Sequence, residues 1–180
     1  MKPNPIPPHP GQESVWDYPR PPRLEDTDKS IRVIFNNVVL AETNKAKRVL
    51  ETSHPPSYYI PPEDVKVEYL ISNPRKTFCE WKGYASYYDI SVDAKYVNYP
   101  VWRYLEPTTY FLPIKGYYSF YANLMDACYV NDELVKPQAG NLYGGWITSD
   151  IVGPFKGEAG TRSVSCTHLR AHETRCNLVC

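Results

Sequence analysis

This sequence has neither an excess of charge of one sign nor a long apolar run. Lys and Arg together number 20, as do Asp and Glu, so the formal net charge at pH 7 is zero. A general nucleic-acid binder usually carries a basic face, so we expect no nucleic-acid partner. No stretch approaches the ~18 apolar residues of a transmembrane helix, and we expect no membrane partner.

The first residues, Met1-Lys-Pro-Asn-Pro5, lack the apolar core of a signal peptide. The five cysteines are an odd number, so they cannot all pair within the chain. Together these two features favour a reduced, cytoplasmic setting.

Motifs that would name an activity or a cofactor are also missing. The chain has no Gly-x-x-x-x-Gly-Lys-Ser/Thr loop to hold phosphates, and no Asp-x-Asp pair at the end of a predicted strand to hold magnesium. Structural zinc sites use paired Cys-x-x-Cys ligands, but residues 12–161 contain only Cys79 and Cys128. We therefore expect no cofactor.

Proline and tyrosine, in contrast, are abundant. The composition along the chain indicates three parts. Residues 1–14 are Pro-rich and polar, which predicts a disordered arm. Residues 15–161 are interpreted as one β domain with wrapping N- and C-terminal segments. At its start, Trp16 lies among prolines and is expected to pack on the surface, with a ligand role for Trp16 or Arg20 as the alternative. Residues 162–180 are interpreted as a disordered tail.

Short β-strands dominate the predicted domain. The clearest hairpin joins residues 31–35 to residues 38–41 through Asn36-Asn37, a pair that accepts positive φ. Residues 67–71 and 84–92 are further predicted strands, and Pro61-Pro-Glu-Asp64 predicts one helical turn. Strands recur every 8–12 residues with no long amphipathic helix between them. This spacing predicts a mainly β fold, a small two-sheet barrel or sandwich with few short helices.

Several segments of the chain resemble one known family. The two main blocks are Glu51-Thr-Ser-His-Pro-Pro-Ser-Tyr-Tyr-Ile-Pro-Pro-Glu-Asp-Val65 and Cys79-Glu-Trp-Lys-Gly-Tyr-Ala-Ser-Tyr-Tyr88, and a third is Ile114-Lys-Gly-Tyr-Tyr-Ser-Phe-Tyr121. They resemble the signature blocks of domain of unknown function 427. Residues 13–22 and 143–157 resemble the flanking segments of its long form, so the likeness covers roughly residues 12–161.

This resemblance implies an architecture more than an activity. It implies a compact β fold of two sheets that meet like a tent, similar to methionine sulfoxide reductase B type domains. The family's catalogue label suggests nucleotidyl transfer. The resemblance supplies no substrate and no catalytic residues.

Catalytic candidates come from the two main blocks. Cys79 and His54 could form a thiolate and its base, since a nearby imidazole lowers the pKa of a thiol. Glu51 could act as a general acid or base, as could Asp64 and Glu80. Each also has a structural interpretation: a small buried side chain for Cys79, a turn residue bonded to backbone for His54, and strand-edge charge for Glu51.

Ligand-binding candidates share an aromatic ring or a cation. Such groups can line a pocket for a planar or anionic small molecule, although core packing explains most of the rings equally well. They are Arg75, Trp81, Lys82, Tyr87, Trp102 and Tyr104.

The tail, residues 162–180, contains further histidines and cysteines, which are residue types that bind metals. His172, Cys176 and Cys180 recur every four residues, which places them on one face if the tail is helical. They are the candidates for a metal site, although the spacing matches no zinc finger.

Three functions remain open from the sequence. The first is a domain that binds a small planar or anionic molecule. The second is an enzyme, either a nucleotidyl transferase or a thiol-dependent catalyst that uses Cys79 and His54. The third is a protein-interaction module that docks through the Pro-rich arm, and the oligomeric state is left undetermined.

Overall fold

The computed structural model describes residues 3–140 and 143–159. Its two larger sheets each have four strands. The sheet with order β10-β9-β8-β7 contains Leu70–Cys79 (β7), Gly83–Val92 (β8), Lys95–Tyr104 (β9) and Tyr118–Phe120 (β10). The sheet with order β12-β11-β3-β4 contains Ile31–Phe35 (β3), Val38–Thr43 (β4), Ala127–Val130 (β11) and Glu133–Leu134 (β12).

Three smaller sheets connect and cover the larger ones. The three-stranded sheet, order β2-β5-β6, contains Arg23–Asp26 (β2), Lys47–Leu50 (β5) and Ser57–Tyr59 (β6). The two-stranded sheets pair Glu13–Ser14 (β1) with Ile151–Val152 (β15), and Lys136–Pro137 (β13) with Trp146–Ile147 (β14). The described helical segments are all 3-10: Val15–Asp17 (η1), Pro62–Asp64 (η2), Val67–Tyr69 (η3), Thr109–Ile114 (η4) and Ala122–Leu124 (η5).

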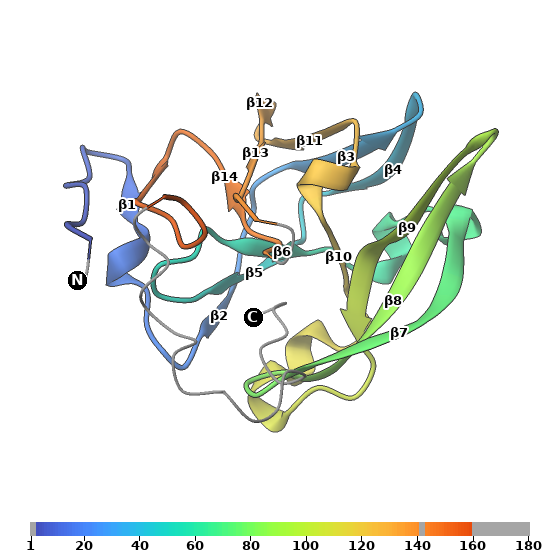
Figure 1. Ribbon diagram of the computed structural model, residues 1–180, viewed down its shortest axis with the longest axis horizontal. Helices are drawn as coiled ribbons and strands as arrows, with labels where there is room; N and C mark the ends of the chain where they lie inside the picture. Colours follow the sequence, from blue (N-terminus) through green and yellow to red (C-terminus); the bar gives the residue numbers. More distant parts are fainter. Residues whose placement is uncertain (1–2, 141–142, 160–180) are drawn as a thin grey trace.

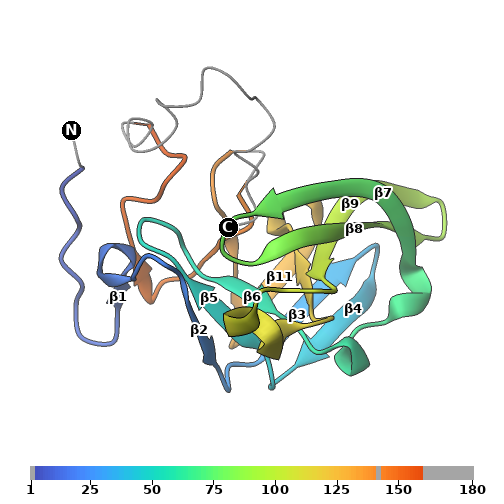
Figure 2. The same ribbon diagram turned by 90° about the horizontal axis from the view of Figure 1, so that it is seen from below.

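The mainly β prediction with few short helices is confirmed, but the barrel alternative is wrong. Among the described residues no sheet closes on itself: in each sheet of three or more strands, the first and last strands do not pair with each other. The long strands β7, β8 and β9 form one layer, and Figure 2 shows it apart from the layer that contains β3 and β4. A large apolar core lies between the two four-stranded sheets and contains Val33, Leu40, Ile90 and Val101.

The predicted hairpin at Asn36-Asn37 is confirmed. β3 and β4 pair antiparallel, and the two Asn residues between them have φ of 47° and 63°. Such angles suit a two-residue turn whose twist matches that of the strands. The predicted helical turn is also present as η2.

The predicted strand at residues 67–71 is wrong in its first half. Val67–Tyr69 form η3, and β7 begins at Leu70. Val67 is 47% exposed. β-propensity depends on burial against a neighbouring strand, and an exposed Val has no such support.

The two ends of the described domain lie against each other, as Figure 1 shows for β1. β1 pairs in parallel with β15, and the Ile6 amide donates to the Gly153 carbonyl at 2.9 Å. The Trp16 indole Nε1 donates to the Pro154 carbonyl, also at 2.9 Å. These contacts bring the segments before residue 20 and after residue 145 to the turn that follows β5.

Candidate functional site

The turn after β5 carries the first charged groups of the site. Glu51 is 5% exposed, and its Oε1 accepts from the Arg20 guanidinium, with Nη2 at 3.0 Å. Ser53 has a φ of 71°, in the left-handed region. Two backbone hydrogen bonds hold it there: its amide donates to the Val15 carbonyl at 3.0 Å, and its carbonyl accepts from the Lys156 amide at 2.8 Å. Both terminal segments therefore fix the position of Glu51.

His54 closes this turn and is held in a neutral form. The Gln138 Nε2 amide lies 3.2 Å from His54 Nδ1 and also donates to the Lys156 carbonyl at 2.7 Å. Because an amide nitrogen only donates, Nδ1 accepts and the imidazole proton lies on Nε2. Burial, together with the nearby cations Lys156, Arg20 and Lys82, lowers the pKa of His54 to about 3. At neutral pH His54 is therefore uncharged.

Lys82 comes from the turn between β7 and β8, and it is the most unusual residue of the domain. Its side chain is 0% exposed, and its Nζ has no hydrogen-bond partner within residues 3–140 and 143–159. Two tyrosine rings surround the ammonium, with centroids 5.6 Å away for Tyr104 and 6.0 Å for Tyr59. Burial lowers the pKa of Lys82 to about 8, and the Glu51 carboxylate opposes that shift.

The turn that carries Lys82 is fixed by the chain after β9. The Lys82 carbonyl accepts from the Thr108 amide at 3.1 Å, and the Thr108 hydroxyl donates to the Trp81 carbonyl at 2.5 Å. Gly83 has a φ of 101°, which a residue with a side chain rarely adopts. The Lys-Gly pair at this turn therefore directs the Lys82 side chain into the protein while the backbone reverses.

One carboxylate, that of Glu51, binds Arg20 and also acts electrostatically on Lys82. Glu51 Oε1 binds Arg20, whereas Glu51 Oε2 is buried and has no hydrogen-bond partner among the described residues. Lys82 is within electrostatic reach of Glu51 but forms no ion pair of 4 Å or less among the described residues. With Lys82 protonated, the Arg20, Glu51 and Lys82 group has a net charge of +1.

The six predicted ligand-binding residues lie on one aromatic cluster. Cys79, Tyr87, Trp102 and Tyr104 are buried members, and Trp81 packs against them. Trp102 Nε1 donates to the Tyr59 hydroxyl at 3.3 Å. Lys82 faces this cluster through its tyrosine contacts, and the catalytic candidate Cys79 is a small buried part of it at 2% exposure.

Arg75, the sixth predicted residue, lies in a corner made by two tyrosines. Its guanidinium carbon is 4.6 Å from the Tyr99 ring centroid and 5.2 Å from that of Tyr87, and the two rings are nearly perpendicular at 85°. Asp89 holds this corner, since its carboxylate accepts from the Tyr99 amide at 2.7 Å. Arg75 forms no ion pair with the described residues, and its Nε is buried without a partner among them.

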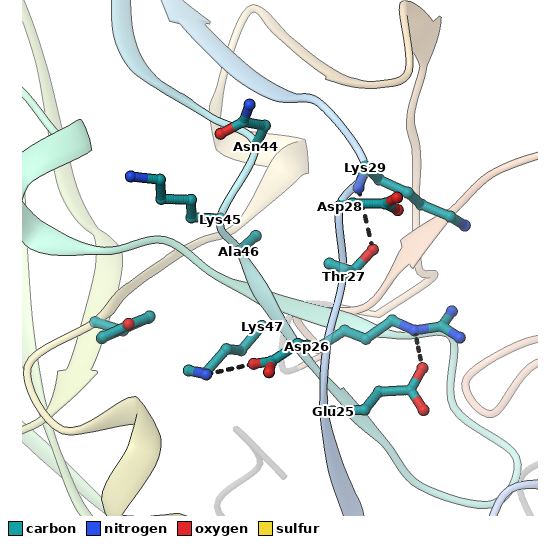
Figure 3. A pocket seen from close by; sticks show the side chains of 11 residues that line it. Glu25, Asp26, Thr27, Asp28, Lys29, Asn44, Lys45, Ala46 and Lys47 are labelled. Carbon is teal, nitrogen blue, oxygen red and sulfur yellow. Dashed lines mark hydrogen bonds and ion pairs between the residues drawn. The ribbon is translucent and has the colours of Figure 1, made fainter.

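A charged groove with a volume of about 670 Å³ lies elsewhere, beside the end of β2 and the start of β5 (Figure 3). Its lining residues are mostly charged: Glu25, Asp26, Asp28, Lys29, Lys45, Lys47 and Arg48, with Tyr117. Most of these charges are paired. Lys47 binds Asp26, a contact drawn in Figure 3, and Arg48 binds Glu25. Lys29 binds Asp150 outside the groove at 2.6 Å.

This groove corrects one conclusion from the sequence. β2 was not predicted, and it ends at Asp26, so Asp26-Thr27-Asp28 is an Asp-x-Asp pair at the end of a strand. The alternation of apolar and polar residues that predicts a strand is absent from β2, because Leu24 is its one apolar residue. No group of three or more His, Cys, Asp or Glu side chains within the described residues is arranged to hold a metal ion. The metal candidates His172, Cys176 and Cys180 lie outside the described residues.

The site also uses residues that the sequence did not single out. Tyr59 lies inside the first signature block, but its role as a wall of the Lys82 environment depends on how β6 packs against β9. Gln138 and Lys156 are far from His54 in the chain and have no motif around them. Their positions around His54 require residues 136–140 and 143–157 to pack over the turn after β5, which local sequence does not encode.

The family can be stated from the comparison with known families. Residues 23–131, more than half of the chain, match the family described as domain of unknown function DUF427, whose short label refers to nucleotidyl transfer. The chain therefore belongs to the DUF427 family, as the resemblance predicted. No curated protein matches the chain. Among the described residues, no helix is both long and apolar enough to cross a membrane.

The match divides the site into two parts. Glu51, His54 and Lys82 lie inside residues 23–131, whereas Arg20 and Gln138 come from the flanking segments of this chain. The flanking segments therefore supply one cation and the amide that orients His54.

Proposed function

We propose that this domain binds a small molecule that carries an acidic group, and that Lys82 receives that group. The observation that carries the proposal is a fully buried ammonium with no hydrogen-bond partner among the described residues. An unpaired ammonium in a protein interior costs several kcal/mol. A bound carboxylate or phosphate offsets that cost because it supplies both acceptor atoms and the opposite charge.

The charge of the surrounding groups supports an anion rather than a cation. Arg20 and Lys82 together carry two positive charges, and Glu51 carries one negative charge. One acidic group would therefore neutralise the cluster. His54 does not change this balance, since it is uncharged at neutral pH.

The aromatic surroundings favour a ligand with a planar part. Tyr59 and Tyr104 both face the ammonium, and their rings are 6.4 Å apart at an angle of 42°. Rings of this kind pack against flat apolar groups. Small aromatic or conjugated acids are thus the ligand class that fits best.

Thermal unfolding with a panel of anions tests this proposal. The panel contains monocarboxylates, dicarboxylates, aromatic carboxylates, inorganic phosphate and nucleotides. A bound anion raises the melting temperature of the wild type in a concentration-dependent way. The variant Lys82→Met should abolish the shift, and Lys115→Met, an exposed lysine outside both candidate sites, is the matched control and should retain it. Equal shifts in all three proteins, or none with any anion, contradict the proposal.

The groove supports a second candidate, nucleotide binding with a divalent cation. The supporting observation is that Asp26 ends β2 and Asp28 follows it, in a groove that Lys45, Lys47 and Tyr117 also line. Carboxylates at a strand end hold magnesium in many phosphoryl-transfer sites, and lysines bind phosphates. The family label points to the same class of reaction.

The same unfolding experiment separates the two candidates. In the groove hypothesis, ATP with magnesium stabilises the wild type and Lys82→Met equally, and Asp28→Asn removes the effect. In the Lys82 hypothesis, Asp28→Asn leaves every anion-dependent shift unchanged.

A further inference from the structure

We propose that Lys82 is a carbonyl-reacting amine, and that the acid bound beside it is an oxo acid that forms an imine with Lys82 Nζ. This inference rests on the proposed function and adds a covalent step to it. It concerns the same site, but it requires more than charge: the amine must lose a proton, and a group must take that proton.

The position of Lys82 suits an amine nucleophile. Its Nζ is buried, has no hydrogen-bond partner among the described residues and faces the rings of Tyr59 and Tyr104. An ammonium in such surroundings releases its proton more readily than one in water, because water no longer stabilises the charge. Burial accordingly lowers the pKa of Lys82 to about 8, so a substantial fraction is neutral near physiological pH.

Glu51 is an acidic group whose charge acts on Lys82 without an ion pair of 4 Å or less, so a water between them would carry the proton. One of its oxygens is occupied by Arg20, while Oε2 is buried and has no hydrogen-bond partner among the described residues. It lies within electrostatic reach of Lys82. A carboxylate with one oxygen fixed and one unpartnered can accept a proton from the amine and return it to the departing oxygen.

The reaction balances without any other reactant. The lone pair of the neutral amine attacks the carbonyl carbon, an N–C bond forms, and the C–O π electrons move to oxygen. A proton passes from nitrogen to that oxygen through Glu51, which gives a carbinolamine. Glu51 then returns to the hydroxyl the proton that the ammonium first released, the C–O bond breaks, water leaves, and the nitrogen lone pair forms the C=N bond. Overall, one ammonium and one carbonyl give one protonated imine and one water, so the charge is unchanged.

An oxo acid fits better than a neutral carbonyl compound. The cluster of Arg20, Glu51 and Lys82 has a net charge of +1 before the reaction, and the protonated imine keeps that charge. A carboxylate on the carbonyl compound therefore neutralises the site both before and after the imine forms. A neutral aldehyde leaves the buried charge uncompensated in both states.

Reductive trapping tests the covalent step on the full chain. The protein is incubated at pH 7 with glyoxylate, the smallest such acid, and with cyanoborohydride, which reduces an imine to a stable amine. Peptide mass spectrometry then measures carboxymethylation at each lysine. Lys82 should react at least about 10-fold faster than the exposed lysines Lys45, Lys76 and Lys115, since a lysine of ordinary pKa is almost entirely protonated at pH 7. Denaturation of the protein should remove that advantage.

Two substitutions separate this inference from the proposed function. Lys82→Arg keeps the cation but cannot form an imine, so it should lose the adduct and keep a carboxylate-dependent rise in melting temperature. Glu51→Gln should slow trapping at Lys82 without changing the rate at Lys45. If Lys82→Arg does not fold, competition replaces it: oxalate, which cannot form an imine, should slow trapping at Lys82 only.

The outcomes are distinct. Anion-dependent stabilisation that requires Lys82, with trapping at Lys82 no faster than at exposed lysines, overturns the covalent step and leaves the proposed function intact. Fast trapping at Lys82 that is not slowed by oxalate, together with no anion-dependent stabilisation, overturns the acid-binding site on which the inference rests. Slow trapping and no stabilisation overturn both.

Discussion

Two regions of this protein are rich in charge, and they differ in how the charges are satisfied. The groove beside the end of β2 and the start of β5 has seven charged side chains, and its main ion pairs, Lys47 with Asp26 and Arg48 with Glu25, join residues of the two strands. The cluster around Lys82 has three, of which the ammonium and one carboxylate oxygen are buried without partners among the described residues.

The comparison shows that the number of charges is a poor guide to a binding site. Exposed ion pairs contribute little free energy, because water solvates each charge almost as well as its partner does. A buried charge without a partner is costly, and a fold that retains one has a use for it or compensates for it elsewhere. The cluster around Lys82 has such a buried charge, whereas most charges of the groove are paired.

The largest difference between the regions should appear on removal of a carboxylate. Glu51→Gln leaves Arg20 and Lys82 without their shared anion, and should lower the free energy of unfolding by about 3 kcal/mol. Asp26→Asn in the groove should lower it by less than about 1 kcal/mol, because the Asp26 side chain is 84% exposed. Urea unfolding at pH 7 measures both. Similar losses in the two variants would remove the distinction between the regions.

Removal of the buried cation should instead raise the free energy of unfolding. Lys82→Met should raise the free energy of unfolding at pH 7 by about 1–3 kcal/mol, since the folded state no longer buries an ammonium. The pKa of Lys82 is about 8 when folded and near 10.5 when unfolded, so the wild type gains stability as pH rises from 8 to 10.5. The advantage of the variant should therefore shrink over that range. Lys45→Met should change stability by less than about 0.5 kcal/mol at either pH.

Low pH should lower the free energy of unfolding through the protonation of His54. The pKa of His54 is about 3 in the folded protein, below its ordinary value of 6.5, so the unfolded state binds the proton first as pH falls. As pH falls from 6.5 to 4, the free energy of unfolding should decrease more steeply in the wild type than in His54→Asn. The difference between the two slopes should be about 1 kcal/mol per pH unit. The same substitution at the exposed His9 is the control and should leave the wild-type slope in place. Parallel curves for wild type and His54→Asn would show that His54 takes up its proton in the native fold.

The smallest effect should come from the groove pair itself. A double-mutant cycle with Asp26→Asn and Lys47→Gln should give a coupling free energy below about 1 kcal/mol, and 1 M salt should reduce it further. A coupling that is larger and independent of salt would mean that the groove is less hydrated than its exposure suggests.

The local sequence pattern was sufficient to predict much of the fold. Asn36-Asn37 between two apolar runs predicted the hairpin, and the strand at residues 84–92 followed from its β-branched and aromatic residues. The same rules missed β2, because Arg23–Asp26 pairs with β5 through its backbone while its side chains are mostly polar. They also extended a strand into η3, where Val67 is exposed.

The site was predictable only in part, for a physical reason. Cys79, Tyr87, Trp102 and Tyr104 were candidates because of their type, and their gathering follows from the pairing of β7, β8 and β9. The orientation of His54 depends instead on Gln138, which is 84 residues away in the chain. Whether a lysine is paired is a property of its three-dimensional surroundings, so the sequence could name Lys82 as a candidate but could not show that its ammonium is buried without a partner.

Calorimetric titration at pH 8 tests the central claim most directly, because it reports both binding and the proton on Lys82. Burial lowers the pKa of Lys82 to about 8, so part of the Lys82 side chains is neutral at that pH, and a bound acid should raise the pKa again and so take up protons. We predict that oxalate binds the wild type with a heat that depends on the ionisation enthalpy of the buffer, and that Lys82→Met gives no such heat. Binding with the same heat in every buffer, or equal binding by Lys82→Met, would contradict the assignment of Lys82 as the residue that receives the acid.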